Sequence, residues 1–140
     1  MKYGSLILEK KEYVYLKRIL NVSGYASDFQ AQKSLLKLSE ELKSAHIVDE
    51  EDMPQDVIRF NSKVTVVSET GWEKTLQVVN PKDRDAKQDK ISVLMPMGAA
   101  LFGYSNNDTV VWDFPGGTQE LKITNVTQME TLRGIGDLVI

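Results

Sequence analysis

The sequence predicts an α+β protein, in which two helices precede a mainly antiparallel sheet of about five strands with one short helix. Two observations carry this expectation. Apolar residues recur at helical spacing up to Ala45, whereas beyond Pro54 they alternate with a period of two. Pro54 itself cannot continue a helix, and it follows the acidic run at residues 49–52. We therefore expect a helical unit at residues 1–52 and a sheet unit at residues 53–140.

The helical unit is expected to form an antiparallel hairpin, which is a short coiled coil. In the first helix the apolar residues share one face at i, i+3 and i+7: Tyr13, Leu16 and Leu20. Gly24 interrupts this pattern, and a second helix over residues 28–45 follows. Its apolar residues are spaced 4-3-4-3, the heptad period: Ala31, Leu35, Leu38, Leu42 and Ala45. Two consecutive helices with a short connection favour antiparallel packing.

The sheet unit is predicted from β-branched residues in alternating patterns. Residues 63–67 and 72–79 are expected to pair around a Gly71 turn. A polar loop at residues 81–90 follows. The remaining strands are predicted from three further runs, at residues 91–94, 109–114 and 118–126.

A short helix and a turn interrupt these strands. Residues 98–103 are too small and too helix-prone for a strand, and Gly103 is a candidate for the C-terminal cap. Pro115 and Gly116 suit the two central positions of a type II turn, so a hairpin is expected there. Met95 and Pro96 end the preceding strand, because proline cannot donate to the ladder.

Composition excludes several classes of site. The 140 residues are 41% hydrophobic and 26% charged, with a net charge of −3, which gives no electrostatic reason to bind nucleic acid. There is no cysteine, hence no disulfide and no thiolate zinc site. Asp83, Asp85 and Asp89 are spaced like calcium ligands but lack the glycine and the glutamate of that loop, which indicates a solvated loop. Without a signal peptide or a membrane span, we expect a cytoplasmic protein, with no metal or cofactor.

Several motifs in order resemble one family. The segments Met-Pro-Met-Gly-Ala-Ala-Leu-Phe-Gly at residues 95–103 and Pro-Gly-Gly at 115–117 resemble the C-terminal domain of the Gre-type (GreA/GreB) transcription elongation factors. Residues 53–57 and 61–64 are similar to the entry of this domain in one short homologue, the regulator of nucleoside diphosphate kinase. The resemblance covers residues 53–140, and it covers residues 1–52 in architecture alone.

This resemblance implies a fold, a partner and a docking site. The sheet unit is expected to be FKBP-like. The partner is expected to be RNA polymerase, with the hairpin entering its secondary channel and a monomeric protein docking through one turn. The docking residues are then Met95, Pro96, Met97 and Gly98. Family members place an aspartate two residues before the proline, where this chain has Leu94, so one charge contact is absent.

The hairpin tip decides whether transcript cleavage is expected. The resemblance assigns the tip to Gly24, Tyr25 and Asp28. Cleavage factors hold magnesium there with a pair of acidic residues, because one carboxylate rarely holds a hard cation. Here Asp28 is alone, so we expect a regulator that neither is an enzyme nor stimulates cleavage.

Three alternatives stay open at this point. The chain can be a genuine cleavage factor, it can act on nucleoside diphosphate kinase, or it can be an FKBP-like peptidyl-prolyl isomerase. An isomerase needs a concave pocket walled by aromatic side chains. The candidates for such a pocket are Phe102, Tyr104, Trp112 and Phe114.

Overall fold

The computed structural model describes residues 3–23, 29–114 and 117–129 of the chain. Its helices are α1 (Lys10–Ser23), α2 (Phe29–Leu42) and α3 (Pro96–Leu101). The strands are β1 (Ile7–Glu9), β2 (His46–Val48), β3 (Lys63–Ser68), β4 (Glu73–Val79), β5 (Lys90–Ser92), β6 (Thr109–Phe114) and β7 (Gly117–Thr127). Three short 3-10 turns complete the list: η1 (Glu50–Asp52), η2 (Pro81–Asp83) and η3 (Ala86–Gln88).

The main sheet has five strands in the order β5-β4-β3-β7-β6. All neighbours are antiparallel except β4 and β5, which run parallel. A parallel pair needs a crossover connection, and the segment with η2 and η3 supplies it. The prediction of a mixed helix and sheet protein with a mainly antiparallel five-stranded sheet is therefore confirmed.

A second, two-stranded sheet was not expected from the sequence. Strands β1 and β2 pair in parallel, with Ile7 opposite His46 and Glu9 opposite Val48. The His46 amide also donates to the Leu6 carbonyl at 2.8 Å. The His46 side chain is exposed. This pairing fixes the chain before α1 to the chain after α2.

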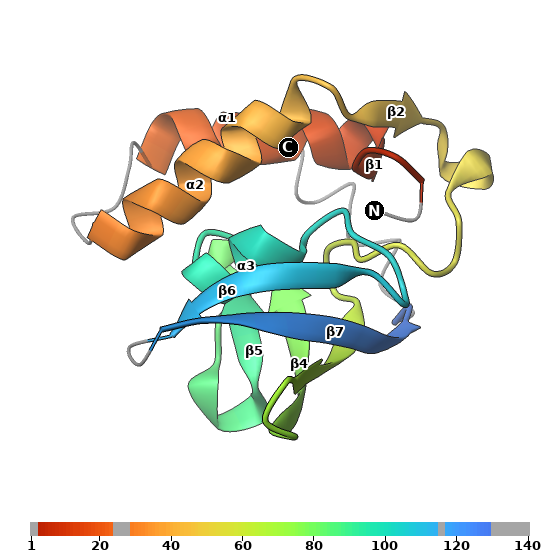
Figure 1. Ribbon diagram of the computed structural model, residues 1–140. Helices are drawn as coiled ribbons and strands as arrows, with labels where there is room; N and C mark the ends of the chain where they lie inside the picture. The colour runs from red at the N-terminus through yellow and green to blue at the C-terminus, as the bar shows by residue number, and fades with distance from the viewer. Residues whose placement is uncertain (1–2, 24–28, 115–116, 130–140) are drawn as a thin grey trace.

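One hydrophobic core joins the helices to the sheet. Val64 and Val66 of β3 alternate with outward residues and are fully buried, as the period of two predicts. The same buried cluster contains apolar residues of the two long helices: Leu16, Leu20, Leu35, Leu38 and Leu42. Helix α2 packs against α3, which lies between α2 and the sheet (Figure 1). The division into units at residue 53 stays a prediction.

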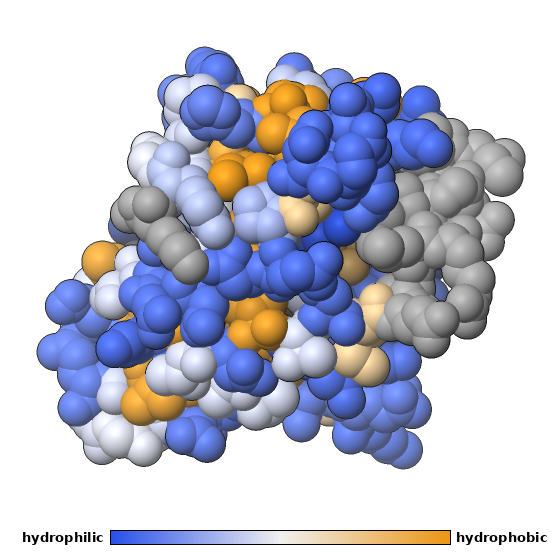
Figure 2. All heavy atoms as spheres, turned by 90° about the vertical axis from the view of Figure 1, so that its right-hand side faces the viewer, coloured by the Kyte–Doolittle hydropathy of each residue, from blue (hydrophilic) through white to orange (hydrophobic). Residues whose placement is uncertain are grey.

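The face of the molecule in Figure 2 is mostly hydrophilic where its residues are coloured. Figure 2 shows one face of the molecule, on which small apolar patches are separated by polar residues. No helix within the described ranges is long and apolar enough to cross a membrane.

Candidate functional site

The predicted docking turn, residues 95–98, is anchored by hydrogen bonds to Ser92 and by the first turn of α3. The Ser92 carbonyl accepts the Met95 amide at 3.0 Å, and the Ser92 hydroxyl accepts the Leu94 amide at 3.0 Å. Met95 is extended and caps α3, and its carbonyl accepts the Ala99 amide at 2.8 Å. Pro96 occupies the first helical position, where no amide hydrogen is needed. The helix therefore begins two residues before the expected Gly98.

Gly98 is required by a close approach of two backbone segments. It is buried, and a β-carbon at this position would overlap the Ser92 carbonyl oxygen. The Ser92 carbonyl could make room for a side chain at position 98 only if the end of β5 moved. Gly103 follows the helix cap with a φ of +85°, the left-handed conformation that the predicted C-terminal cap needs. Its environment is also tight, since a β-carbon would lie 3.1 Å from the Leu6 side chain.

The turn presents an apolar and uncharged surface. Met95 is 37% exposed, whereas Pro96 and Met97 are half-buried. Leu94, at the position where the resemblance implied an aspartate, packs partly buried against the core. Of the four predicted docking residues, Met95 therefore offers the largest accessible side chain, and Gly98 serves packing.

Two polar links hold the long helices against the rest of the molecule. The first is a 2.6 Å hydrogen bond from the Tyr104 hydroxyl to the Glu41 carboxylate on α2. Burial raises the pKa of Tyr104 well above its usual range, and the bond to Glu41 raises it further. The hydroxyl thus stays protonated and donates across the neutral pH range.

The second link is an ionic cluster around the buried Glu12 and Arg59, which the sequence did not reveal. The Arg59 guanidinium donates through Nε to Glu12 of α1 at 2.7 Å, and through its two terminal nitrogens to Glu50 at 2.7 and 2.8 Å. The Phe60 amide donates to the second Glu12 oxygen at 3.2 Å. Glu9 caps α1 by accepting amides of its first turn, at 2.9 and 3.0 Å.

The cluster perturbs the acidity of its members. Burial raises the pKa of Glu12 to about 7, against the opposing effect of the Arg59 charge. Hydrogen bonding to Arg59 lowers the pKa of the more exposed Glu50. Burial alone would lower the pKa of Arg59. The hydrogen bonds to Glu50 and the negative charge of Glu12 outweigh burial, so the pKa of Arg59 is raised overall. The guanidinium stays charged, and the cluster joins α1, η1 and the segment before β3.

The other candidate residues fall into two groups. Gly24, Tyr25 and Asp28 lie outside the described residues, as does the turn at residues 115–116. Asp83 accepts a 2.6 Å hydrogen bond from Asn80, and Asp85 caps η3 by accepting the Lys87 amide. These aspartates therefore have structural roles in the loop. Within the described ranges no three acidic or histidine side chains gather into a possible metal site.

Two of the four aromatics proposed for an isomerase pocket belong to the core. Phe102 is 1% exposed and lies edge-on to Phe60, with ring centroids 4.9 Å apart. Tyr104 is 7% exposed and bonded to Glu41. Neither ring is available as the wall of an open pocket.

Comparison with known proteins gives one family. The family model described as "Transcription elongation factor, GreA/GreB, C-term" matches residues 53–128. Transcription elongation factor GreA of Bradyrhizobium diazoefficiens is 34% identical over 93 residues, which are 66% of this chain and 59% of that protein. GreA of Anaeromyxobacter sp. is 37% identical over 90 residues, 64% of this chain and 54% of that protein. The chain spans less than two thirds of the length of these relatives.

A solved structure resembles most of the chain. The prokaryotic transcription elongation factor GreA/GreB from Nitrosomonas europaea superposes with a TM-score of 0.72 at 31% sequence identity. The match covers 89% of this chain and 98% of that chain. It therefore extends beyond the C-terminal segment into the helices.

Proposed function

This chain belongs to the GreA/GreB family through its C-terminal domain, and from that premise we propose that it binds RNA polymerase and regulates transcription at the secondary channel. The observation that carries the proposal is the family match over residues 53–128, which includes the whole 95–98 turn. The likeness to the Nitrosomonas protein over 89% of the chain supports it.

The 95–98 turn is the proposed docking surface. Its backbone is fixed by the bonds to Ser92, so little conformational freedom is lost when a partner binds. With Met95 exposed and Leu94 in place of an acid, the contact is apolar rather than ionic. Binding through this turn should therefore depend weakly on salt.

The two long helices are the proposed arm, an antiparallel hairpin that enters the channel. Helix α2 has 14 residues, so at 1.5 Å per residue it is about 21 Å long. We propose that this arm does not stimulate transcript cleavage, because the sequence of the tip offers Asp28 alone where a magnesium ion needs two carboxylates. We also propose a likeness to the regulator of nucleoside diphosphate kinase, carried by residues 53–57 and 61–64, and a function that is not enzymatic. The FKBP-like character of the sheet unit stays a prediction.

A genuine cleavage factor is the alternative, favoured by the names of the GreA relatives. A peptidyl-prolyl isomerase is the less favoured alternative, because Phe102 and Tyr104 are buried and do not wall an open pocket. A proline-peptide isomerisation assay separates the isomerase from both transcription factors.

The direct test of the docking surface replaces Pro96 by Asn and measures retention on immobilised core RNA polymerase. Pro81→Asn is the matched control, because Pro81 also begins a short helix, at η2. Wild type and Pro81→Asn should bind equally, a Gre factor should displace both, and Pro96→Asn should bind at least about fivefold more weakly, as for loss of one hot-spot contact. Unchanged binding of Pro96→Asn would move the docking surface elsewhere. Absence of wild-type binding would end the proposal.

A further inference from the structure

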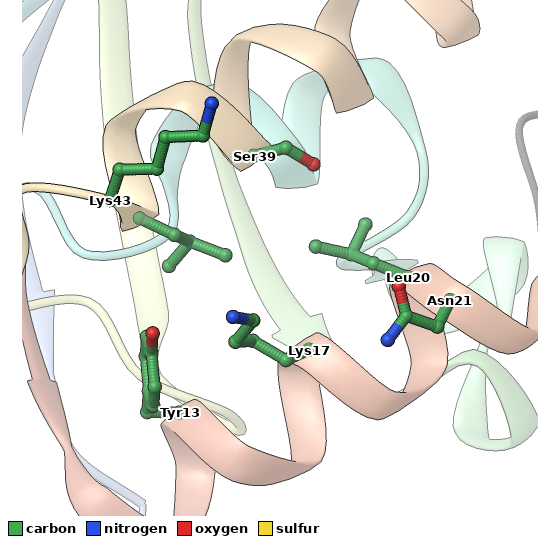
Figure 3. A pocket seen from close by; sticks show the side chains of 7 residues that line it. Tyr13, Lys17, Leu20, Asn21, Ser39 and Lys43 are labelled. Carbon is green, nitrogen blue, oxygen red and sulfur yellow. The ribbon is translucent and has the colours of Figure 1, made fainter.

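A pocket of about 220 Å³ opens between α1 and α2, and the residues that line it do not include the 95–98 turn. Its apolar part is formed by Leu20 and Leu42, which are themselves 7% and 5% exposed. Lys17 of α1 and Lys43, which directly follows the end of α2, stand on its sides (Figure 3). The pocket therefore combines an apolar wall with positive charge.

Neutral donors complete the lining. Tyr13 and Asn21 come from α1, at one helical turn on either side of Lys17, and Ser39 comes from α2, one turn before Lys43. Figure 3 shows the side chains of both helices bordering one space. Of the described residues that line this space, none is acidic.

Neither lysine is held firmly by a carboxylate in the pocket. The Lys17 ammonium lies 5.6 Å from the centroid of the Tyr13 ring. Lys43 contacts Glu40 at 3.0 Å, but both side chains are more than 70% exposed, so that ion pair is weak. Glu41, the other acid nearby in the sequence, is bonded to Tyr104 instead. An incoming anion thus has two available cations and few competitors.

The size and polarity of the pocket define the ligand. Inorganic phosphate satisfies the lysines but makes no apolar contact with the small parts of Leu20 and Leu42 that face the pocket. The volume is below that of most drug-sized sites, which excludes large cofactors. We propose that this pocket binds a carboxylate carried on a short branched apolar stem, either as a free small acid or as an acidic side chain beside an apolar one. This goes beyond the proposed function and does not rest on it.

The probe for this site is 4-methylpentanoate, and its neutral amide, 4-methylpentanamide, is the matched ligand. Titration followed by amide chemical shifts should show saturable changes at Lys17, Asn21 and Ser39. The amide should bind at least about threefold more weakly, because it loses the charge contacts. Phosphate should produce no saturable change at these residues.

Two variants and one control test the lysines. Lys17→Gln and Lys43→Gln should each weaken binding of 4-methylpentanoate about two- to fivefold, the loss of one exposed ion pair. Lys37→Gln, an exposed position on α2 outside the pocket, should change nothing. The unfolding midpoint of each variant shows that the fold is intact.

The source of the carboxylate is assigned by a blocked peptide, acetyl-Ala-Leu-Glu-Leu-Ala-amide, which has one carboxylate. Tighter binding of the peptide than of the free acid supports a partner's side chain, and the reverse order supports a small molecule. Three results would overturn the proposal. The first is equal affinity for 4-methylpentanoate and its amide, and the second is a loss of affinity in Lys37→Gln as large as in the two pocket variants. The third is that neither 4-methylpentanoate nor the peptide shows saturable binding.

Discussion

The Nε atom of Arg59 donates a 2.7 Å hydrogen bond to the carboxylate of Glu12, across 47 positions of the sequence. Both side chains are nearly inaccessible, at 5% and 1% exposure. The remaining nitrogens of the guanidinium bind Glu50 in a bidentate geometry. This cluster, together with the Tyr104–Glu41 bond, sets how the long helices lie on the sheet.

Removing the guanidinium should destabilise the fold. Arg59→Met should lower the free energy of unfolding by about 3 kcal/mol at pH 8, because Glu12 is left as a buried charge without its partner. Urea denaturation measures this difference. Arg84→Met, at an exposed position, should cost less than about 0.5 kcal/mol. A loss of less than about 1 kcal/mol for Arg59→Met would show that the ionic cluster does not hold α1 to the segment before β3.

Stability should depend on pH through Glu12. Its carboxyl has a pKa of about 7 in the folded protein against 4.5 for the free group, so between these values the folded state binds more protons than the unfolded state. The contribution of Glu12 is therefore fully present below about pH 4.5 and is lost as pH rises to about 7. It amounts to roughly 3–4 kcal/mol, at about 1.4 kcal/mol for each pKa unit.

The comparison of wild type with Glu12→Gln isolates this contribution. The glutamine variant lacks the titrating group, whereas the lowered pKa of Glu50 acts in both proteins. The difference in free energy of unfolding should move in favour of the variant as pH rises from 4.5 to 7. A difference that stays constant, or moves the other way, would contradict the raised pKa.

Helix α2 offers a matched pair of leucines for testing the core. Leu38 is 1% exposed and Leu36 is 52% exposed on the same helix. Leu38→Ala should lower the free energy of unfolding by about 2–4 kcal/mol, through lost burial and a cavity. Leu36→Ala should change it by less than about 0.5 kcal/mol. Equal effects in thermal or urea denaturation would mean that the predicted seam is not packed.

Much of the fold was predictable because its signals are local. The limits of β6 agree with the predicted strand at residues 109–114, since β-branched residues stand between clear turn signals. The glycine cap at Gly103 was also predictable from residue type. Helix α3 begins earlier than expected, at Pro96, because proline at the first helical position is preorganised rather than disruptive.

The rest depends on contacts between distant segments. Strands β1 and β2 pair across both long helices, and no local pattern at Leu8 or His46 indicates a partner. The ionic cluster was missed because Glu12, Glu50 and Arg59 read as ordinary surface charges. Only the arrangement of α1 over the segment before β3 buries Glu12 and Arg59 and brings Glu50 to their edge. For the candidate site, sequence indicated the 95–98 turn, but not which of its residues are exposed.

The most direct test measures cleavage in stalled, backtracked RNA polymerase complexes. At saturating concentration this protein should not accelerate cleavage, and in excess it should slow cleavage by a genuine Gre factor, because both would occupy one channel. The Pro96→Asn variant should lose this inhibition. Two results would contradict this expectation. One is robust cleavage by the protein alone that disappears in the Asp28→Ala variant. The other is cleavage by the Gre factor that stays undiminished at any excess of this protein.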